Sequence, residues 1–321
     1  MSQIRILKVC VCALVALTLV FSGDIASAQK KVNMVIASGP IGGAFYPISG
    51  GIASIVNKKA EGLNMNVQVT GGGVENTRLV GRGQVDLALV GADQAYYGIH
   101  KQEMFKKDDL KLETLGTLHP TVYHYVALKK SNLKTFEDLK GKKVAIGEPG
   151  GGAEMGFNMM LRALNWTRKD IRPVYLPYEQ ATEQLADGLI DAAVIVAGIP
   201  AAAVTSLTAN HEITLLEIPE KIWLAYYKLS PFSTFEEFKP GTYRGVNVPV
   251  KMVVGRIQLA RRNGLDPEIA YKITKALYSN LNELVAHHGA AKFINAETAY
   301  KTSIPLNKGA ERFFKEAGYL K

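Results

Sequence analysis

Short apolar runs alternate with longer segments of helical spacing along most of the chain. The strand-like runs are 33–37, 67–70, 87–90, 115–118, 123–128, 144–146, 174–176, 192–196, 213–217 and 250–254. The segments with helical spacing are 48–59, 76–82, 154–164, 179–187 and 267–286. Strands that are apolar throughout are typical of a parallel sheet buried between helices. The pattern therefore predicts an α/β fold.

Two extended runs divide this series into parts. Residues 121–128 and 248–254 bracket a block that holds its own α/β alternation, and we expect them to pair as crossover strands that form a hinge. After residue 256 the pattern becomes helical, and this tract should pack back on the N-terminal part. The sequence thus predicts two domains, 29–121 together with 256–321, and 122–255.

The first 28 residues have the pattern of an export signal. Arg5 and Lys8 precede the apolar run 9–21, and Ala26-Ser27-Ala28 supplies small residues at a cleavage position. The run is shorter than the roughly 20 apolar residues that a membrane-spanning helix needs. We expect a signal peptide, residues 1–28, cleaved after Ala28, and a periplasmic mature protein.

Composition narrows the chemistry of the mature protein. Both cysteines, Cys10 and Cys12, lie in the predicted signal peptide, so thiol nucleophiles and cysteine metal sites are excluded. The formal net charge of +9 is compatible with an anionic ligand, an acidic partner or nucleic acid. The basic residues are scattered and form no long stripe, so we expect no nucleic-acid partner.

Catalytic signatures are absent from the sequence. There is no G-x-S-x-G, P-loop, H-E-x-x-H or dinucleotide G-x-G-x-x-G motif. His119 and His124 are five residues apart in a predicted strand, where alternation places them on opposite faces. We therefore expect no cofactor, no metal and no enzymatic activity.

Glycine-rich turns carry the strongest functional signal. A strand runs into the turn 38–47, and a second strand runs into the turn 147–152, each at the start of a helix. Such turns present free backbone N–H groups and the positive end of a helix dipole to an anion. Three more loops, 71–76, 90–96 and 196–200, also follow strands, and strand ends in open α/β sheets line ligand crevices. The loops should converge on one cleft.

These loops together resemble the TAXI family, the extracytoplasmic substrate-binding proteins of TRAP transporters. The motifs are Gly-Gly-Ala-Phe-Tyr-Pro at 42–47, Gly-Val-Glu-Asn at 73–76, Ala-Asp-Gln-Ala-Tyr at 92–96, Asp-Leu-Lys-Gly-Lys at 138–142 and Ala-Gly-Ile-Pro at 197–200. They occur in the family's order, and the resemblance covers essentially the whole mature chain.

The resemblance implies a type II periplasmic-binding-protein fold, in which two α/β domains joined by crossover strands close on a ligand. It further implies a small organic acid or amino acid as ligand and delivery to TRAP membrane subunits; a protein that diffuses to a permease is expected to be a monomer. The ligand-binding residues that it implies are Gly43, Ala44, Phe45, Tyr46, Asn76, Gly91, Ala92, Asp93, Gly150, Gly151, Gly152, Ala153 and Gly198.

The chain departs from the family pattern at two places. Gly91 stands where the family usually has glutamine, and Gly151 and Ala153 stand where it has serine and threonine. Three hydrogen-bonding side chains are therefore missing, each worth about 1 kcal/mol net. The backbone N–H groups remain, so we expect a carboxylate to bind still, in a ligand that differs at that end.

Several roles stay open at this point. Phe45 can serve as a helix-entry contact and Tyr46 as the better ligand residue, because its hydroxyl and ring can both contact a solute. Asn76 can be a helix cap or a ligand residue, and Asp93 can hold a loop N–H or a ligand ammonium. The alternative function keeps the same fold but serves an ABC permease or a sensor kinase. A periplasmic enzyme on this fold is a more distant alternative.

Overall fold

The computed structural model describes residues 31–41 and 43–321. The predicted signal peptide and its cleavage position lie outside the described residues. Asn33–Lys321 form one compact unit, so the domain boundaries at 121/122 and 255/256 stay a prediction.

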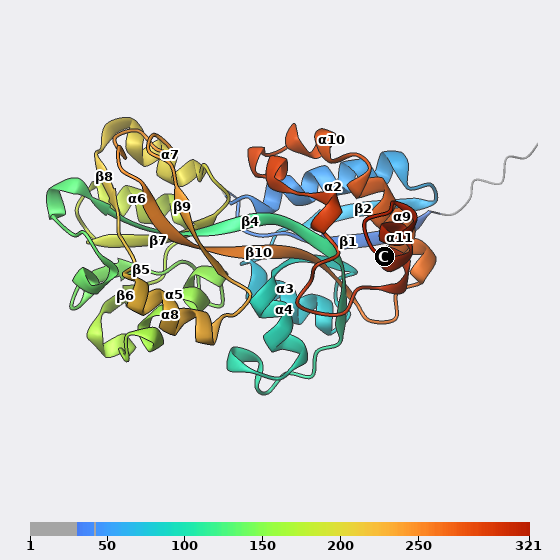
Figure 1. The fold of residues 1–321 in the computed structure, drawn as a ribbon, viewed down its shortest axis with the longest axis horizontal. Coiled ribbons are helices and arrows are strands. Elements are labelled where there is room, and N and C mark those ends of the chain that lie inside the picture. The colour runs from blue at the N-terminus through green and yellow to red at the C-terminus, as the bar shows by residue number, and fades with distance from the viewer. Residues whose placement is uncertain (1–30, 42) are drawn as a thin grey trace, which may run out of the picture. The chain divides into compact units, whose positions relative to one another are not determined.

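Within the described residues one mixed sheet contains ten strands, in the order β2-β1-β3-β10-β4-β7-β5-β6, with β8 paired to β4 and β9 to β10 (Figure 1). The strands are β1 (Val32–Ala37), β2 (Leu63–Gln68), β3 (Leu87–Gly91), β4 (Leu112–Leu128), β5 (Lys143–Ala145), β6 (Arg172–Val174), β7 (Ala192–Ala197), β8 (Ile213–Leu215), β9 (Thr234–Phe238) and β10 (Val250–Arg262).

Helices pack on both faces of this sheet. They are α2 (Phe45–Lys59), α3 (Gly73–Gly81), α4 (Ala92–Ile99), α5 (Gly152–Ala163), α6 (Tyr178–Ala186), α7 (Ala202–Asn210), α8 (Glu220–Leu229), α9 (Pro267–Tyr278), α10 (Leu281–Val285) and α11 (Lys308–Glu316). We call the elements around β1, β2 and β3 the first lobe and those around β5, β6 and β7 the second lobe.

The two long strands β4 and β10 run through both lobes. They pair antiparallel, with Val254 opposite Val122, which confirms the expected pairing of crossover strands. On the first-lobe side β10 pairs with β3, and on the second-lobe side β4 pairs with β7. The strand order is thus β2-β1-β3-β10 in the first lobe and β6-β5-β7-β4 in the second, which is the same order counted along each lobe's own sequence. This order confirms the type II periplasmic-binding-protein fold.

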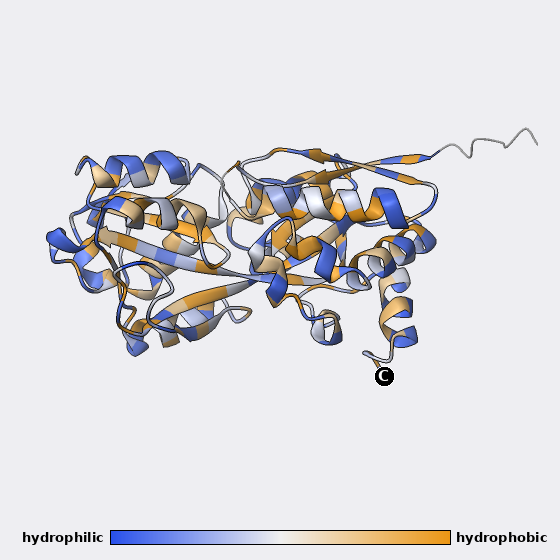
Figure 2. Cartoon of the chain, turned by 90° about the horizontal axis from the view of Figure 1, so that it is seen from above, coloured by the Kyte–Doolittle hydropathy of each residue, from blue (hydrophilic) through white to orange (hydrophobic). Residues whose placement is uncertain are grey.

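Hydrophobic residues occur along the strands and helices of both lobes (Figure 2), and many of their side chains are buried in apolar clusters. In the first lobe Ile36, Ile52 and Ile273 belong to one buried cluster, which joins β1, α2 and α9. In the second lobe a separate cluster includes Ile195 and Val204. Central strands such as β3 and β7 are covered on both sides, so their residues are apolar nearly throughout, and this is the signal that made the centre of the sheet predictable.

Three predicted elements differ most from those observed. The run 250–254 is only the first part of β10, which continues to Arg262, so the expectation of a helical pattern directly after residue 256 is wrong. The runs 115–118 and 123–128 are parts of the single strand β4, which continues through Pro120 because that residue pairs with Arg256 beside a register shift. The predicted helix 267–286 is two helices, α9 and α10. The break lies at Asn280, whose backbone leaves helical geometry (φ −136°, ψ 35°) and whose side-chain Nδ2 donates to the Ala276 carbonyl at 2.7 Å.

Candidate functional site

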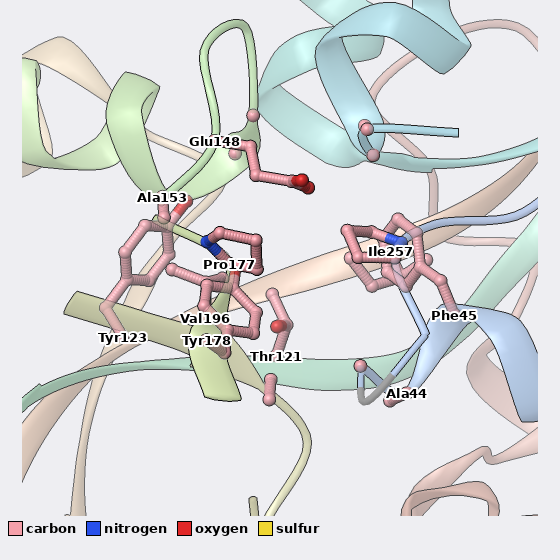
Figure 3. Close-up of a pocket in the computed structure, with 18 of the residues that line it drawn as sticks. Ala44, Phe45, Thr121, Tyr123, Glu148, Ala153, Pro177, Tyr178, Val196 and Ile257 are labelled. Carbon is pink, nitrogen blue, oxygen red and sulfur yellow. The ribbon is translucent and has the colours of Figure 1, made fainter. Parts of the chain in front are cut away.

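A cavity lies where the two lobes meet (Figure 3). It has about 740 Å³ of space free of protein atoms, part of which is open to solvent. The residues that line it are Pro40, Gly43, Ala44, Phe45, Gly71, Gly72, Gly73, Gln94, Thr121, Tyr123, Glu148, Gly151, Gly152, Ala153, Pro177, Tyr178, Val196, Ala197 and Ile257.

Helices from both lobes begin at this cavity. Gly73 is the first residue of α3, Gly152 that of α5 and Tyr178 that of α6, and no side chain caps these three N-termini. The backbone N–H groups of Gly73, Gly152 and Ala153 form no hydrogen bond with another described residue. Uncapped first-turn N–H groups with the helix dipole behind them attract an anion.

Gln94 joins the two lobes at the cavity wall. Its Oε1 accepts the Gly91 N–H at 2.9 Å, and the side chain is buried. A Cβ atom on Gly73 would overlap Oε1, and one on Gly152 would lie 2.9 Å from Nε2. A side chain at either position would require the end of the Gln94 side chain to move, so glycine lets the two helix starts approach this amide as observed. The Gln94 Nε2 forms no hydrogen bond with another described residue, so it can serve a solute.

The opposing walls of the cavity are apolar and aromatic. In Figure 3, Phe45 and Ile257 lie on one side, and Tyr123, Tyr178 and Val196 lie on the other. Burial raises the pKa of Tyr178 to about 12 and that of Tyr123 well above its ordinary value. Both phenols are therefore neutral at physiological pH and offer a hydroxyl group beside a flat apolar face.

The residues expected from the family resemblance fall into two sets. Those that line the cavity are Gly43, Ala44, Phe45, Gly151, Gly152 and Ala153. Those that do not line it are Tyr46, Asn76, Gly91, Ala92, Asp93, Gly150 and Gly198. Tyr46 has 40% of its surface exposed, one position along α2 from Phe45. Gly150 lies one residue before the lining and adopts φ +73°, which turns the chain into α5.

Asn76 links two loops to strand β3. It is fully buried, and its Nδ2 donates to the carbonyls of Ser38 at 2.6 Å and Leu89 at 2.7 Å, while its Oδ1 accepts the Thr70 hydroxyl at 2.7 Å. The expectation that it could be the helix cap is wrong, because Gly72 occupies the N-cap of α3. Its observed contacts position the cavity wall.

Asp93 lies in a buried contact between α4 and the segment that follows α8. Its Oδ1 accepts the Gln94 N–H at 2.8 Å, and its Oδ2 lies 3.5 Å from the Ser230 hydroxyl. Beside it, the Tyr97 hydroxyl donates to the Leu229 carbonyl. Burial raises the pKa of the Asp93 carboxyl from 3.8 to about 6, against the hydrogen bonds, which lower it. The N–H that it accepts belongs to the next residue in α4, and a role as partner of a ligand ammonium stays a prediction.

Gly198 permits a close approach between the lobes. A Cβ atom at this position would lie 2.6 Å from the Ala290 Cβ, so only glycine lets the loop after β7 pack against residues 289–293. At Gly91 the close contact lies within the first lobe, because a Cβ there would be 2.8 Å from Asp93 Oδ1. Ala92 is buried at the start of α4, and its carbonyl accepts the Ser303 hydroxyl. These contacts shape the surroundings of the cavity.

The two histidines of β4 are buried. His124 lies between the Ile195 carbonyl and the Tyr243 hydroxyl, at 2.9 and 2.8 Å, and burial lowers its pKa to about 4. His119 has no hydrogen-bond partner for either ring nitrogen among the described residues, and its ring lies 6.2 Å from that of Phe45. No cluster of three or more metal-ligating side chains occurs in the described part of the chain.

Every helix within residues 31–41 and 43–321 is too short or too polar to span a membrane.

Several lining residues escaped the sequence analysis. Gln94 and Glu148 lie in the predicted loops 90–96 and 147–152, but they are not among the ligand-binding residues that the resemblance implies. Tyr123 lies on β4 and Tyr178 at the start of α6, and they reach the cavity only through strand pairing and helix packing. Local motifs carry no signal for such residues.

Comparison with known proteins places the chain among others of this fold. A protein of Bordetella bronchiseptica RB50 of known structure is 16% identical, with a TM-score of 0.57 over 90% of this chain and 99% of that chain. The periplasmic aliphatic sulphonate binding protein SsuA from Escherichia coli is 15% identical, covering 91% and 89%, with a TM-score of 0.48. A histidine kinase sensor domain with similarity to periplasmic binding proteins is 18% identical, covering 82% and 96%, with a TM-score of 0.44.

The family comparison extends over nearly all of the described residues. The model that matches is that of the NMT1-like family, and the match runs from residue 36 to residue 318. It includes every strand end and helix start that lines the cavity. The chain belongs to the NMT1-like family.

Proposed function

We propose that the protein captures a small solute in the cavity between its lobes and presents it to a partner in the membrane. The observation that carries this proposal is that both lobes contribute residues to the cavity wall. The glycine turns of both lobes contribute to it, and Gln94 and Gly152 meet across it. The lobes are connected at β4 and β10, so bending of these two strands opens and closes the cavity.

We further propose that the solute carries a carboxylate, bound at the uncapped N–H groups of α3 and α5. Micromolar binding needs about 8 kcal/mol. A charge at a helix terminus contributes about 0.3 to 2 kcal/mol. The remainder comes from the Gln94 amide and from burial of the solute between Phe45, Tyr123 and Tyr178, which line the cavity.

The partner in the membrane is a separate part of the proposal. The motif resemblance indicates TRAP membrane subunits, whereas the family match carries the description NMT1-like and not TAXI. We therefore give precedence to the alternative, an ABC permease or a sensor kinase. A fused TRAP membrane subunit encoded beside this gene would reverse that order.

The same proposal places the mature protein in the periplasm and assigns it no catalytic role. Solute recovered chemically unchanged after incubation is the expected result. Turnover of the solute would instead support the periplasmic enzyme.

A thermal-shift screen of carboxylic acids on residues 29–321 tests the capture of a solute. A ligand at 100 times its Kd stabilises the folded state by about 2.7 kcal/mol. Gly43 lines the cavity, so Gly43→Trp should abolish the shift. Gly50→Trp is the matched control, because Gly50 does not line the cavity and no atom lies within 4 Å of a Cβ there. The proposal fails if no acid shifts the melting temperature, or if both variants bind like the wild type.

A further inference from the structure

The charge of the cavity wall is opposite to that of the protein. The whole chain has a formal net charge of +9, yet no lysine, arginine or histidine occurs among the described residues that line the cavity. Its one acidic residue is Glu148, and its two tyrosines are neutral because burial raises their pKa values. A solute in this cavity therefore meets one fixed negative charge.

The position of Glu148 is set by the turn that holds it. Gly147 before it adopts φ +82°, and its own carbonyl accepts the Gly151 N–H at 3.0 Å. Its carboxylate forms no hydrogen bond or ion pair with any described residue. Figure 3 shows the side chain extending from the turn into the space between the lobes, with the carboxylate oxygens foremost.

Closing the lobes on a purely anionic solute would bury two like charges together. A carboxylate that is withdrawn from water without a partner is strongly unfavourable, and a second anion nearby adds to the cost. A positively charged nitrogen removes both penalties. The aromatic faces of Phe45, Tyr123 and Tyr178 suit such a group, since cations are attracted to ring faces within about 6 Å.

We propose that Glu148 is a specificity-determining residue that selects solutes with a positively charged nitrogen. This inference rests on the proposed function, because the same solute also presents a carboxylate to the N–H groups of α3 and α5. The ligand class is thus a zwitterion, with its anionic end at the helix starts and its cationic end at Glu148. Simple mono- and dicarboxylic acids are disfavoured.

Matched pairs of compounds test the role of the charge. We would measure Kd by calorimetry for L-glutamate and glutarate, L-leucine and 4-methylpentanoate, and L-phenylalanine and 3-phenylpropanoate, which differ within each pair only in the amino group. The variants are Glu148→Gln and, as control, Glu183→Gln. Glu183 is exposed on α6 and does not line the cavity.

For wild type and Glu183→Gln we expect the amino acid to bind at least tenfold more tightly than its partner acid, which is about 1.4 kcal/mol. In Glu148→Gln the ratio should fall to about one. If partner acids bind wild type as tightly as amino acids, or if Glu148→Gln keeps the tenfold ratio, the inference is wrong while carboxylate capture stands. If none of the six compounds binds, the inference is wrong, whereas capture of a carboxylate is decided separately by the thermal-shift screen.

Discussion

Replacing Asp93 by asparagine should make the protein more stable at neutral pH, although a buried hydrogen-bonded group is altered. The side chain is 7% exposed, and burial raises its pKa from 3.8 to about 6. At 1.36 kcal/mol for each pH unit, that gap corresponds to about 3 kcal/mol. Asparagine keeps an oxygen for the Gln94 N–H and carries no charge, so the variant should regain most of this free energy.

The sign of the effect follows from proton linkage. The folded protein holds the Asp93 proton more tightly than the unfolded chain. The contribution of Asp93 to the free energy of unfolding is therefore highest below pH 3.8. It falls as the pH rises from about 4 to about 6. The asparagine variant does not titrate there, so its advantage should appear over that window and be absent below it.

Urea unfolding of both proteins at pH 4 and pH 7.5 measures this difference. The control is Asp187→Asn, since Asp187 is exposed and forms no ion pair within the described residues. A variant that is no more stable than the wild type at pH 7.5, or whose advantage is equal at both pH values, would refute the reasoning. Because Asp93 does not line the cavity, solute affinity should change by less than about threefold.

Three further outcomes are expected. Phe45→Ala should weaken solute binding at least tenfold and Tyr46→Ala much less, because only the first lines the cavity; calorimetry with equal losses would contradict this. Gly309→Ala should destabilise the protein by about 3 kcal/mol, since a Cβ there collides with the Pro267 carbonyl, whereas Gly289→Ala should be near neutral in the same urea unfolding assay. Burial lowers the pKa of His119 to about 3, so the stability that the folded protein gains from the neutral imidazole is full above pH 6.5 and decreases as the pH falls. His119→Leu should therefore lose less stability than the wild type between pH 7 and pH 5 in the same assay.

The fold could be predicted because its signal is local. A strand covered on both faces is apolar throughout, and β3 and β7 show this at their full length. The break between α9 and α10 was missed because the apolar spacing continues through it. The competing hydrogen bond from Asn280 to the Ala276 carbonyl decides that point, and hydrophobic periodicity does not report it.

The site could be predicted only in part, for geometric reasons. The glycine turns were found because a turn is encoded by its own residues. The direction of a side chain relative to the cavity is not encoded in this way. Phe45 and Tyr46 are neighbours on α2, and successive helical residues point about 100° apart, so only Phe45 lines the cavity. Tyr123 and Tyr178 reach the cavity from other elements, and their contribution depends on how strands and helices pack.

The position of β10 in the sheet has a consequence for the order in which the protein can fold. This strand, near the C-terminal end of the sequence, lies between β3 and β4, and α9 packs on α2. While the polypeptide is being made, β3 therefore has an unpaired apolar edge until β10 follows, and such an edge invites association with other chains. The N-terminal residues start the first lobe, but during synthesis this lobe is completed only when β10 and α9 have been made. C-terminal truncation should therefore damage the lobe that the N-terminal residues start, and leave the second lobe's own strands β5, β6 and β7 paired.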